Sequence, residues 1–253
     1  MNELKGRLTR ELQHDFNVKI MGSLSWSLPI HSIEIGYETV KRTKMDILMK
    51  MMLISFQKGE IASAEELSEI LLVEQLFIND LVNKMSRTGL IEKRGGSFAL
   101  TKAGELQLEN GVFDHEPESG TTTVLYSPLH GDFLSGELAK AIYEEEEEVY
   151  RYQDEFDDWA VTSIEDSAVL NALKSMDIES GEGNVHVVVS DIVSVSDVKI
   201  NLVPCMEFRL YNEAEDLFYV RVWNTLTEHW DETLETQLND KERKEWRDTY
   251  LEK

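Results

Sequence analysis

SAEELSEILLVEQLFINDLVNKMSRTGLIEKRGGSFALTKAG, residues 63–104, is the stretch of this 253-residue chain that decides the fold. A helix is expected to end at Gly89, because glycine adopts the left-handed conformation that follows a helix at little cost. Apolar residues recur before this glycine at the spacing of one helix face. They are Ile78, Leu81, Val82 and Met85. The sequence therefore predicts a helix over 75–87 that buries this face.

A shorter helix is expected just before it. Ser63 followed by Glu66 fits a capping box, in which each residue satisfies a backbone N–H near the other. The expected buried side of this helix consists of Leu67, Ile70 and Leu71. Val73 and Glu74 then leave a connection of the length found in helix-turn-helix units.

The residues after Gly89 predict a small hairpin. Residues 90–94 and 97–101 are extended runs on either side of the turn pair Gly95-Gly96. A further helix over 102–108 is expected to follow, capped by Thr101.

This order of elements, with the ending M-x-x-x-G-L-I…F-x-L-T-x-x-G, resembles the winged helix-turn-helix superfamily over about residues 42–111. The resemblance covers less than a third of the chain and implies that the hairpin is the wing. Winged helices serve DNA binding and protein docking alike, so the resemblance implies a fold and leaves both functions open.

The outward residues of the 75–87 helix support either function. Asn and Gln pair with adenine edges, and Lys and Arg meet phosphates. Glu74 and Asp80 would repel the DNA backbone beside them. A second basic group is expected at the start of a helix over 40–57, an unfavourable place for cations next to the helix dipole. The residues predicted to contact DNA are Lys41, Arg42, Lys44, Gln75, Asn79, Asn83, Lys84, Arg87, Lys93 and Arg94.

The net charge of −24 is unevenly distributed. Residues 1–112 contain 14 basic and 15 acidic residues, whereas residues 113–253 contain 11 basic and 34 acidic residues. This difference predicts a domain boundary near 111–122. The predicted fold class is α+β, with a winged-helix domain followed by an acidic α/β domain that has a mostly antiparallel sheet. The predicted parts are an N-terminal extension with a helix and short strand over 1–39, the winged-helix domain over 40–112, a linker over 113–123 and the acidic domain over 124–253.

Composition also bears on compartment. The lone cysteine, Cys205, excludes an intramolecular disulfide and indicates a reducing interior. The N-terminus alternates charges and is not a signal peptide. The longest apolar run, 45–56, is interrupted by Lys50 and is too short to span a bilayer. We therefore expect a soluble, cytoplasmic protein with no membrane partner.

A helical period of apolar residues in the acidic part predicts one helix from Ser135 to about Trp159. Its acidic side is expected to be a solvated face or, alternatively, a surface for a basic partner. The residues predicted for that partner surface are Glu144, Glu145, Glu146, Glu147, Glu148, Asp154, Asp157 and Asp158.

The rest of the chain predicts a sheet covered by helices. Strands are expected over 185–193, 198–203, 206–211 and 218–223 in meander order. Arg209 and Arg221 are expected to share one face of this sheet and to bind acids from the helix layer. A C-terminal helical region over 226–250, in two segments, is expected to cover the sheet with Leu226, Trp230, Leu234 and Leu238.

Frames for catalysis, such as HExxH, GxSxG and the Walker motif, are missing from the sequence. No catalytic residue, metal or cofactor is predicted, and His130 with Asp132 is the strongest of the weak candidates. Our leading hypothesis is a non-catalytic component of an intracellular multiprotein complex. Its winged helix would dock or lie near DNA, and its acidic domain would bind a protein partner with a basic surface. The main alternative is a transcriptional regulator that binds double-stranded DNA, with the acidic domain for sensing or for homodimer formation. A DNA mimic and a metal-dependent enzyme are the weaker alternatives.

Overall fold

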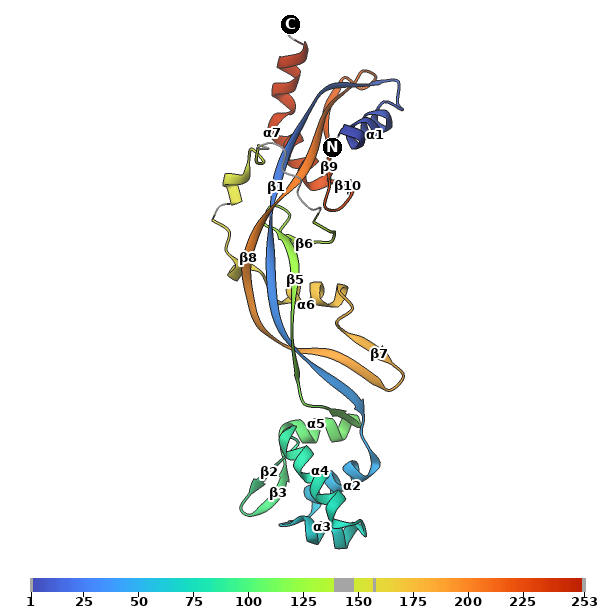
Figure 1. The fold of residues 1–253 in the computed structure, drawn as a ribbon, viewed down its shortest axis with the longest axis vertical. Helices are drawn as coiled ribbons and strands as arrows, with labels where there is room; N and C mark the ends of the chain where they lie inside the picture. Colours follow the sequence, from blue (N-terminus) through green and yellow to red (C-terminus); the bar gives the residue numbers. More distant parts are fainter. Residues whose placement is uncertain (1, 139–147, 157, 252–253) are drawn as a thin grey trace. The chain divides into compact units, whose positions relative to one another are not determined.

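The computed structural model describes residues 2–138, 148–156 and 158–251, and is a mixed α+β structure with a large, curled antiparallel sheet (Figure 1). The helices of the described residues are α1 (Asn2–Leu12), α2 (Ile47–Lys58), α3 (Ala64–Leu71), α4 (Gln75–Arg87), α5 (Lys102–Asn110), α6 (Asp166–Ser175) and α7 (Glu232–Leu251), with 3-10 turns at Gln153–Phe156 and Val161–Ser163. The strands are β1 (Val18–Lys44), β2 (Ile91–Arg94), β3 (Ser97–Leu100), β4 (Val112–Asp114), β5 (Glu118–Ser127), β6 (Asp132–Leu134), β7 (Ser180–Glu182), β8 (Val185–Asn212), β9 (Leu217–Asn224) and β10 (His229–Trp230).

Two long neighbouring strands, β1 and β8, form the centre of the large sheet. Its order is β10-β9-β8-β1-β5-β6, while β4 pairs with β1 and β7 with β8. Asn201 of β8 lies against Ile30 of β1, and Ser190 lies against Glu38, so the two strands run in opposite directions. The described residues thus confirm a largely antiparallel sheet.

The lengths of these strands correct several sequence predictions. The three strands expected over 185–193, 198–203 and 206–211 are one strand, β8. Pro204 lies within this strand, one residue before Cys205, where the pairing with β9 ends. Long runs of β-branched residues paired on both sides outweigh the local turn signals.

The chain divides into two compact units, each built from separate segments. Unit 1 contains residues 1–34, 123–168 and 195–253, and unit 2 contains residues 35–122 and 169–194. The sequence predicted uninterrupted parts instead. Residues 113–123, expected to be a linker, contain most of β4 and the first half of β5.

In unit 1, α7 covers one face of the sheet and α1 packs on the other (Figure 1). Leu234 and Leu238 of α7 are buried against a cluster that includes Trp26 and Phe218. Leu8 of α1 is fully buried against β8 residues of the opposite face.

The C-terminal helical region also differs from its prediction. It is one unbroken helix, α7, which begins at Glu232. Trp230 lies in β10 and Leu226 lies before it, so only two members of the predicted leucine stripe belong to the helix. Leu226 is nevertheless buried in the same cluster.

Unit 2 contains the helix, turn, helix and hairpin that residues 63–104 predict. Ile78, Val82 and Met85 of α4 are buried, as expected from their spacing. Ser63 accepts from the backbone N–H of Glu66 at 3.2 Å, and Glu66 accepts from the N–H of Ala62 at 3.0 Å, which completes the predicted capping box.

The helix α2 starts later than predicted. Its first residue is Ile47, and the Asp46 side chain accepts from the N–H groups of Leu48 and Met49. Lys41, Arg42 and Lys44 therefore lie in β1, and the expected conflict with the helix dipole does not arise. An acidic cap, which complements the dipole, stands there instead.

The long acidic helix predicted from Ser135 to Trp159 is wrong in the described residues. Residues 135–138 are not helical, and Gln153–Phe156 is a single 3-10 turn. Ser27 of β1 instead forms backbone hydrogen bonds with Glu148 (2.8 Å) and Tyr150 (2.9 Å). This extended pairing satisfies the same backbone groups that a helix would use. Residues 139–147 lie outside the described part.

None of the helices in the described residues is both long and apolar enough to cross a membrane.

Replacing Gly104 tests the packing of unit 2, and replacing Gly6 serves as the control. A Cβ on Gly104 would lie 2.1 Å from the backbone oxygen of Leu90, whereas a Cβ on Gly6 of α1 meets nothing within 4 Å. We expect Gly104→Ala to destabilise the protein by about 1–3 kcal/mol or more, because a backbone atom cannot easily move aside. Gly6→Ala is expected to leave stability unchanged or raise it by up to about 1 kcal/mol through helix propensity. Thermal unfolding of the two variants measures this, and equal melting temperatures would refute the close packing of α5 on Leu90.

Candidate functional site

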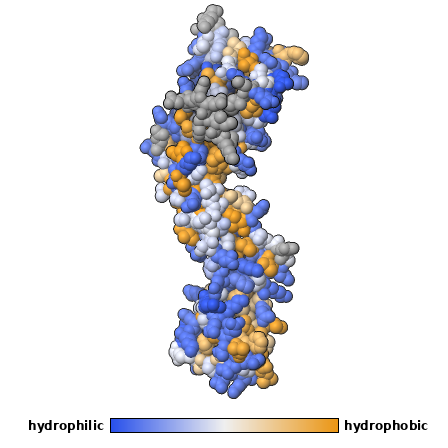
Figure 2. All heavy atoms as spheres, viewed as in Figure 1, coloured by the Kyte–Doolittle hydropathy of each residue, from blue (hydrophilic) through white to orange (hydrophobic). Residues whose placement is uncertain are grey.

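The turn between α3 and α4 presents apolar side chains to solvent. Ile70, Leu72, Leu76 and Phe77 are 56%, 91%, 72% and 60% exposed. These four residues, which we call the turn patch, lie within eight positions of sequence. Hydrophobic residues, in orange, form part of the surface of unit 2 in Figure 2. Scattered exposed leucines are ordinary, but a cluster of large exposed apolar residues marks a surface for binding.

The backbone of the turn accounts for this exposure. Leu72 ends α3 in the left-handed conformation, with φ 54°. Ser68 closes the turn, since its hydroxyl donates to the Val73 carbonyl at 2.6 Å and its own carbonyl accepts from the Val73 N–H. Leucine disfavours this conformation by about 1 kcal/mol relative to glycine. A strained and almost fully exposed leucine contributes nothing evident to folding.

The turn patch was not predicted, although its signal is present in the sequence. Ile70 was expected on the buried side of α3, but the structure buries Leu67 fully there and leaves Ile70 exposed. Leu76 and Phe77 fall outside the register that places Ile78 and Val82 in the core. Apolar residues off the buried register of an amphipathic helix were the sign.

Acidic residues lie close to the turn patch in the sequence. Residues 59–83 contain six acidic residues and no lysine or arginine. Among them, Glu69, Glu74 and Asp80 have exposed side chains close in sequence to the patch. In helix-turn-helix proteins that read DNA, the N-terminal residues of the second helix contact base edges. Here the equivalent residues would bring negative and apolar groups to the phosphates.

Most of the predicted DNA-binding cations already have partners in unit 2. Arg42 donates to both oxygens of Asp114, at 2.7 and 2.8 Å, and this contact is the main cause that raises its pKa. Arg87 lies 3.2 Å from Glu116, and Arg94 donates to Glu92 at 2.6 Å. The Nζ atoms of Lys84 in α4 and Lys93 in β2 lie over aromatic rings, at 4.9 Å from the ring centre of Phe113 and 5.0 Å from that of Phe98.

The polar residues of α4 are in the predicted place. Gln75, Asn79 and Asn83 are exposed along the helix, and Lys41 at the end of β1 is exposed as well. Lys44 is also exposed. These residues form the part of the predicted DNA surface that stays available to a ligand.

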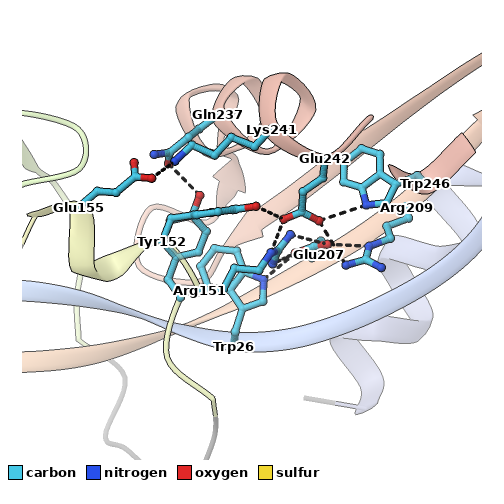
Figure 3. A network of polar contacts seen from close by, with 11 residues as sticks. Trp26, Arg151, Tyr152, Glu155, Glu207, Arg209, Gln237, Lys241, Glu242 and Trp246 are labelled. Atoms are coloured by element: carbon cyan, nitrogen blue, oxygen red, sulfur yellow. Dashed lines mark hydrogen bonds and ion pairs between the residues drawn. The ribbon is translucent and has the colours of Figure 1, made fainter. Parts of the chain in front are cut away.

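A second polar cluster lies inside unit 1 and centres on Glu207 of β8 (Figure 3). Its carboxylate is fully buried and accepts from Arg151 at 2.7 and 3.2 Å. Arg209 donates to it at 3.0 Å, and the indole N–H of Trp26 donates at 2.9 Å. Four donors therefore compensate the desolvation of one buried charge.

Glu242 of α7 completes this network. It pairs with Arg151, accepts from Tyr152 at 3.1 Å and from the Trp246 indole at 3.1 Å, and lies 3.6 Å from Arg209. Burial raises the pKa of Glu242, but the bonds from Arg151 and Tyr152 outweigh it and hold the pKa below its ordinary value. The two carboxylates and two arginines satisfy one another. The network therefore fastens the segment around Arg151 and α7 to the sheet rather than presenting a group for chemistry.

The arginine prediction is confirmed in its partners and wrong in its geometry. Arg209 contacts Glu242, and Arg221 donates to Glu235 at 2.8 Å, both acids of α7. The register pairs Arg209 with Val220 and Phe208 with Arg221. Since directly opposed residues share a face, the two arginines lie on opposite faces of the sheet.

His130, the strongest catalytic candidate of the sequence, lies in a chain of three polar side chains. Its Nδ1 is 2.7 Å from the Ser127 hydroxyl, and its Nε2 is 3.1 Å from both oxygens of Asp231. Asp132, the predicted companion, instead accepts from the N–H of Phe133. Ser127 is fully buried, so no substrate reaches its hydroxyl, and Asp231 caps α7 by accepting from the N–H of Leu234. The hydrogen-bonded chain Ser127–His130–Asp231 therefore connects the end of β5 to the start of α7.

The predicted acidic partner surface is described only in part. Glu148, Asp154 and Asp158 are exposed. Glu144, Glu145, Glu146, Glu147 and Asp157 lie outside the described residues. The neighbouring Glu155 pairs with Lys241 of α7.

Comparison of the chain with protein-family models, with curated proteins and with solved structures finds no match.

Removing one partner of the buried network tests its structural role. Arg151→Met leaves the buried Glu207 and Glu242 carboxylates short of a cation, and we expect it to lower the free energy of unfolding by about 3 kcal/mol. Arg247→Met removes an ion pair with Asp216 that lies at the surface, and a much smaller loss is expected. Urea unfolding monitored by tryptophan fluorescence gives both values. Similar losses in the two variants would show that the Glu207 network does not hold unit 1 together.

Two carboxyl groups with lowered pKa values determine how the stability of the protein changes at acidic pH. Burial raises the pKa of Asp231, but its bonds with His130, Asn224 and Leu234 bring it below its ordinary 3.8, and Glu242 likewise lies below 4.5. A lowered folded-state pKa stabilises the protein above the unfolded-state value and ceases to do so as the pH falls through the folded-state value. We therefore expect the free energy of unfolding to fall as the pH drops below about 4.5. In Asp231→Asn, which keeps a helix-capping side chain, the fall should be shallower; an equally steep fall would exclude Asp231 as a source.

Proposed function

We propose that this protein is a non-catalytic component of a multiprotein complex. Residues 42–111 act in it as a winged helix-turn-helix module that docks on another protein. The exposed acids of unit 1 serve as a second surface, for a basic partner. The single observation that carries the docking role is the turn patch, which places exposed apolar residues where a DNA-reading helix begins.

Three features of unit 2 support docking over DNA reading. The turn patch offers apolar area that becomes favourable only when another surface covers it. Acidic residues flank it and would repel phosphates. The arginines Arg42, Arg87 and Arg94 are already paired with Asp114, Glu116 and Glu92.

A DNA-binding regulator is the second candidate, favoured by the exposed polar side of α4. Gln75, Asn79 and Asn83 are of the residue types that pair with adenine edges. Lys41 and Lys44 would then supply phosphate contacts from the end of β1. In this second candidate the acidic unit senses or dimerises.

Binding to random duplex DNA at low salt separates the two candidates. The docking module is expected to give no shift at micromolar protein, because few unpaired cations face the acids. The regulator predicts a shift that weakens, with a reduced salt slope, when Lys84, Arg87, Lys93 and Arg94 are changed to alanine. A shift with that behaviour would refute the docking role in favour of the regulator.

Capture experiments test the docking role positively. The full chain, a Leu76→Ser/Phe77→Ser variant and a Val198→Ser/Ile200→Ser control are used as bait with nuclease present. The control removes two exposed aliphatic side chains from β8, at 61% and 56% exposure against 72% and 60% for Leu76 and Phe77. A protein retained by the wild type and the control but lost from the turn variant is the expected result. Identical retention by all three baits would show that the turn patch is not a docking surface.

A further inference from the structure

The turn patch and its surrounding charge together define the kind of partner that fits it. We infer that the occupant is a cationic amphipathic segment of another protein, whose aliphatic side chains cover the turn patch while its lysines and arginines meet the surrounding acids. This inference rests on the proposed docking function and names the chemistry of its partner.

The conformation and exposure of Leu72 indicate that the partner is apolar where it covers the turn patch. The left-handed backbone of Leu72, at φ 54°, and its 91% exposure are both unfavourable in the free protein. Glycine would occupy this position without strain. A leucine there gains free energy only when a partner removes its side chain from water, together with Leu76 and Phe77.

The acidic residues near the turn patch in the sequence indicate that the partner is also basic. The segment 59–83, which contains α3, the turn and the first part of α4, has six acidic residues and no lysine or arginine, although residues 1–112 as a whole are almost neutral. Glu69 precedes the patch, Glu74 lies inside it and Asp80 follows it, and all three are exposed. A partner with complementary charge is attracted during association and correctly oriented on docking.

The same charges exclude the two other classes of occupant. A second copy of this chain, docked by the same surface on both partners, would place like charges opposite one another around the patch. DNA would bring phosphates against Glu74 and Asp80. An amphipathic helix with basic residues beside its apolar face satisfies both the apolar and the acidic parts.

The probe is a labelled helical peptide of about 18 residues made of leucine and lysine in an amphipathic order, with a leucine–glutamate peptide of the same length as its counterpart. Fluorescence anisotropy with the full-length protein is expected to show binding of the lysine peptide and none of the glutamate peptide. Leu76→Ser/Phe77→Ser should weaken the binding by about tenfold or more, since two apolar anchors are lost. Val198→Ser/Ile200→Ser should leave it within about twofold.

Charge variants locate the electrostatic part, because the strongly acidic unit 1 also attracts cations. Glu69→Gln/Glu74→Gln should weaken binding and flatten its salt dependence. Glu3→Gln/Glu215→Gln makes the same change of charge on unit 1, at exposed acids outside the predicted partner surface, and should have little effect. An equal response of these two variants, or of the two serine variants, would overturn the inference by showing non-specific attraction.

Leu72→Gly provides the sharpest single variant. It removes an exposed apolar side chain and relieves the left-handed strain, so the melting temperature should be unchanged or higher while peptide affinity falls. A variant with wild-type affinity would overturn the inference. Self-association of the protein that depends on Leu76 and Phe77, seen by sedimentation, would replace the cationic partner with a second copy. Loss of capture by the turn variant, together with no peptide binding, would leave the proposed docking function standing and refute only the partner class.

Discussion

The hydrogen bonds and ion pairs of the buried Glu207 carboxylate are the interactions on which unit 1 depends. A charge removed completely from water is tolerated only with several donors around it. Here they come from the sheet through Trp26 and Arg209 and from the segment at Arg151. Because Arg151 also pairs with Glu242, the same charge fixes α7 over the sheet. The network leaves this region with one arrangement and leaves its carboxylates occupied.

Unit 2 instead combines a complete apolar core with apolar residues that remain exposed. Its core of Met52, Leu67, Ile78 and Met85 is fully buried and needs no further contact. Yet four large apolar residues at the turn between α3 and α4 lie outside that core and in water. Because the turn patch lies outside this core, variants of the turn patch are not expected to disturb the fold. This is why surface variants are informative in unit 2, whereas variants of the Glu207 network report on stability.

Sequence reasoning predicted unit 2 better than unit 1, and the difference has a physical reason. The capping box at Ser63, the register of Ile78 and Met85 and the hairpin at Gly95 are local signals, set by neighbours three or four residues apart. The length of β1 and β8 depends on pairing between residues 152 to 171 positions apart, which no local window contains. Glu207 and Arg151 were not predicted for the same reason, since each reads as an ordinary surface charge until its partner from another segment is placed. Ile70 was misassigned because the helical period fitted it equally well to the buried or to the exposed edge of α3.

The candidate site was only half visible in the sequence. The polar residues Gln75, Asn79 and Asn83 stood out because the register turned them outward, and they are exposed. Leu72, Leu76 and Phe77 passed unnoticed because apolar residues near a helix are readily assigned to a core. To recognise them, one must first identify the residues that the core needs and then ask why the remaining apolar residues are exposed.

Hydrogen–deuterium exchange of the full-length protein, with and without the leucine–lysine peptide, measures the location of the docking surface most directly. Slower exchange confined to the backbone around residues 70–83 is the expected result, since α3, the turn and the first half of α4 would be covered. Protection that instead falls on the strands of unit 1, or on residues 91–100 and the end of β1, would contradict a docking surface at this turn.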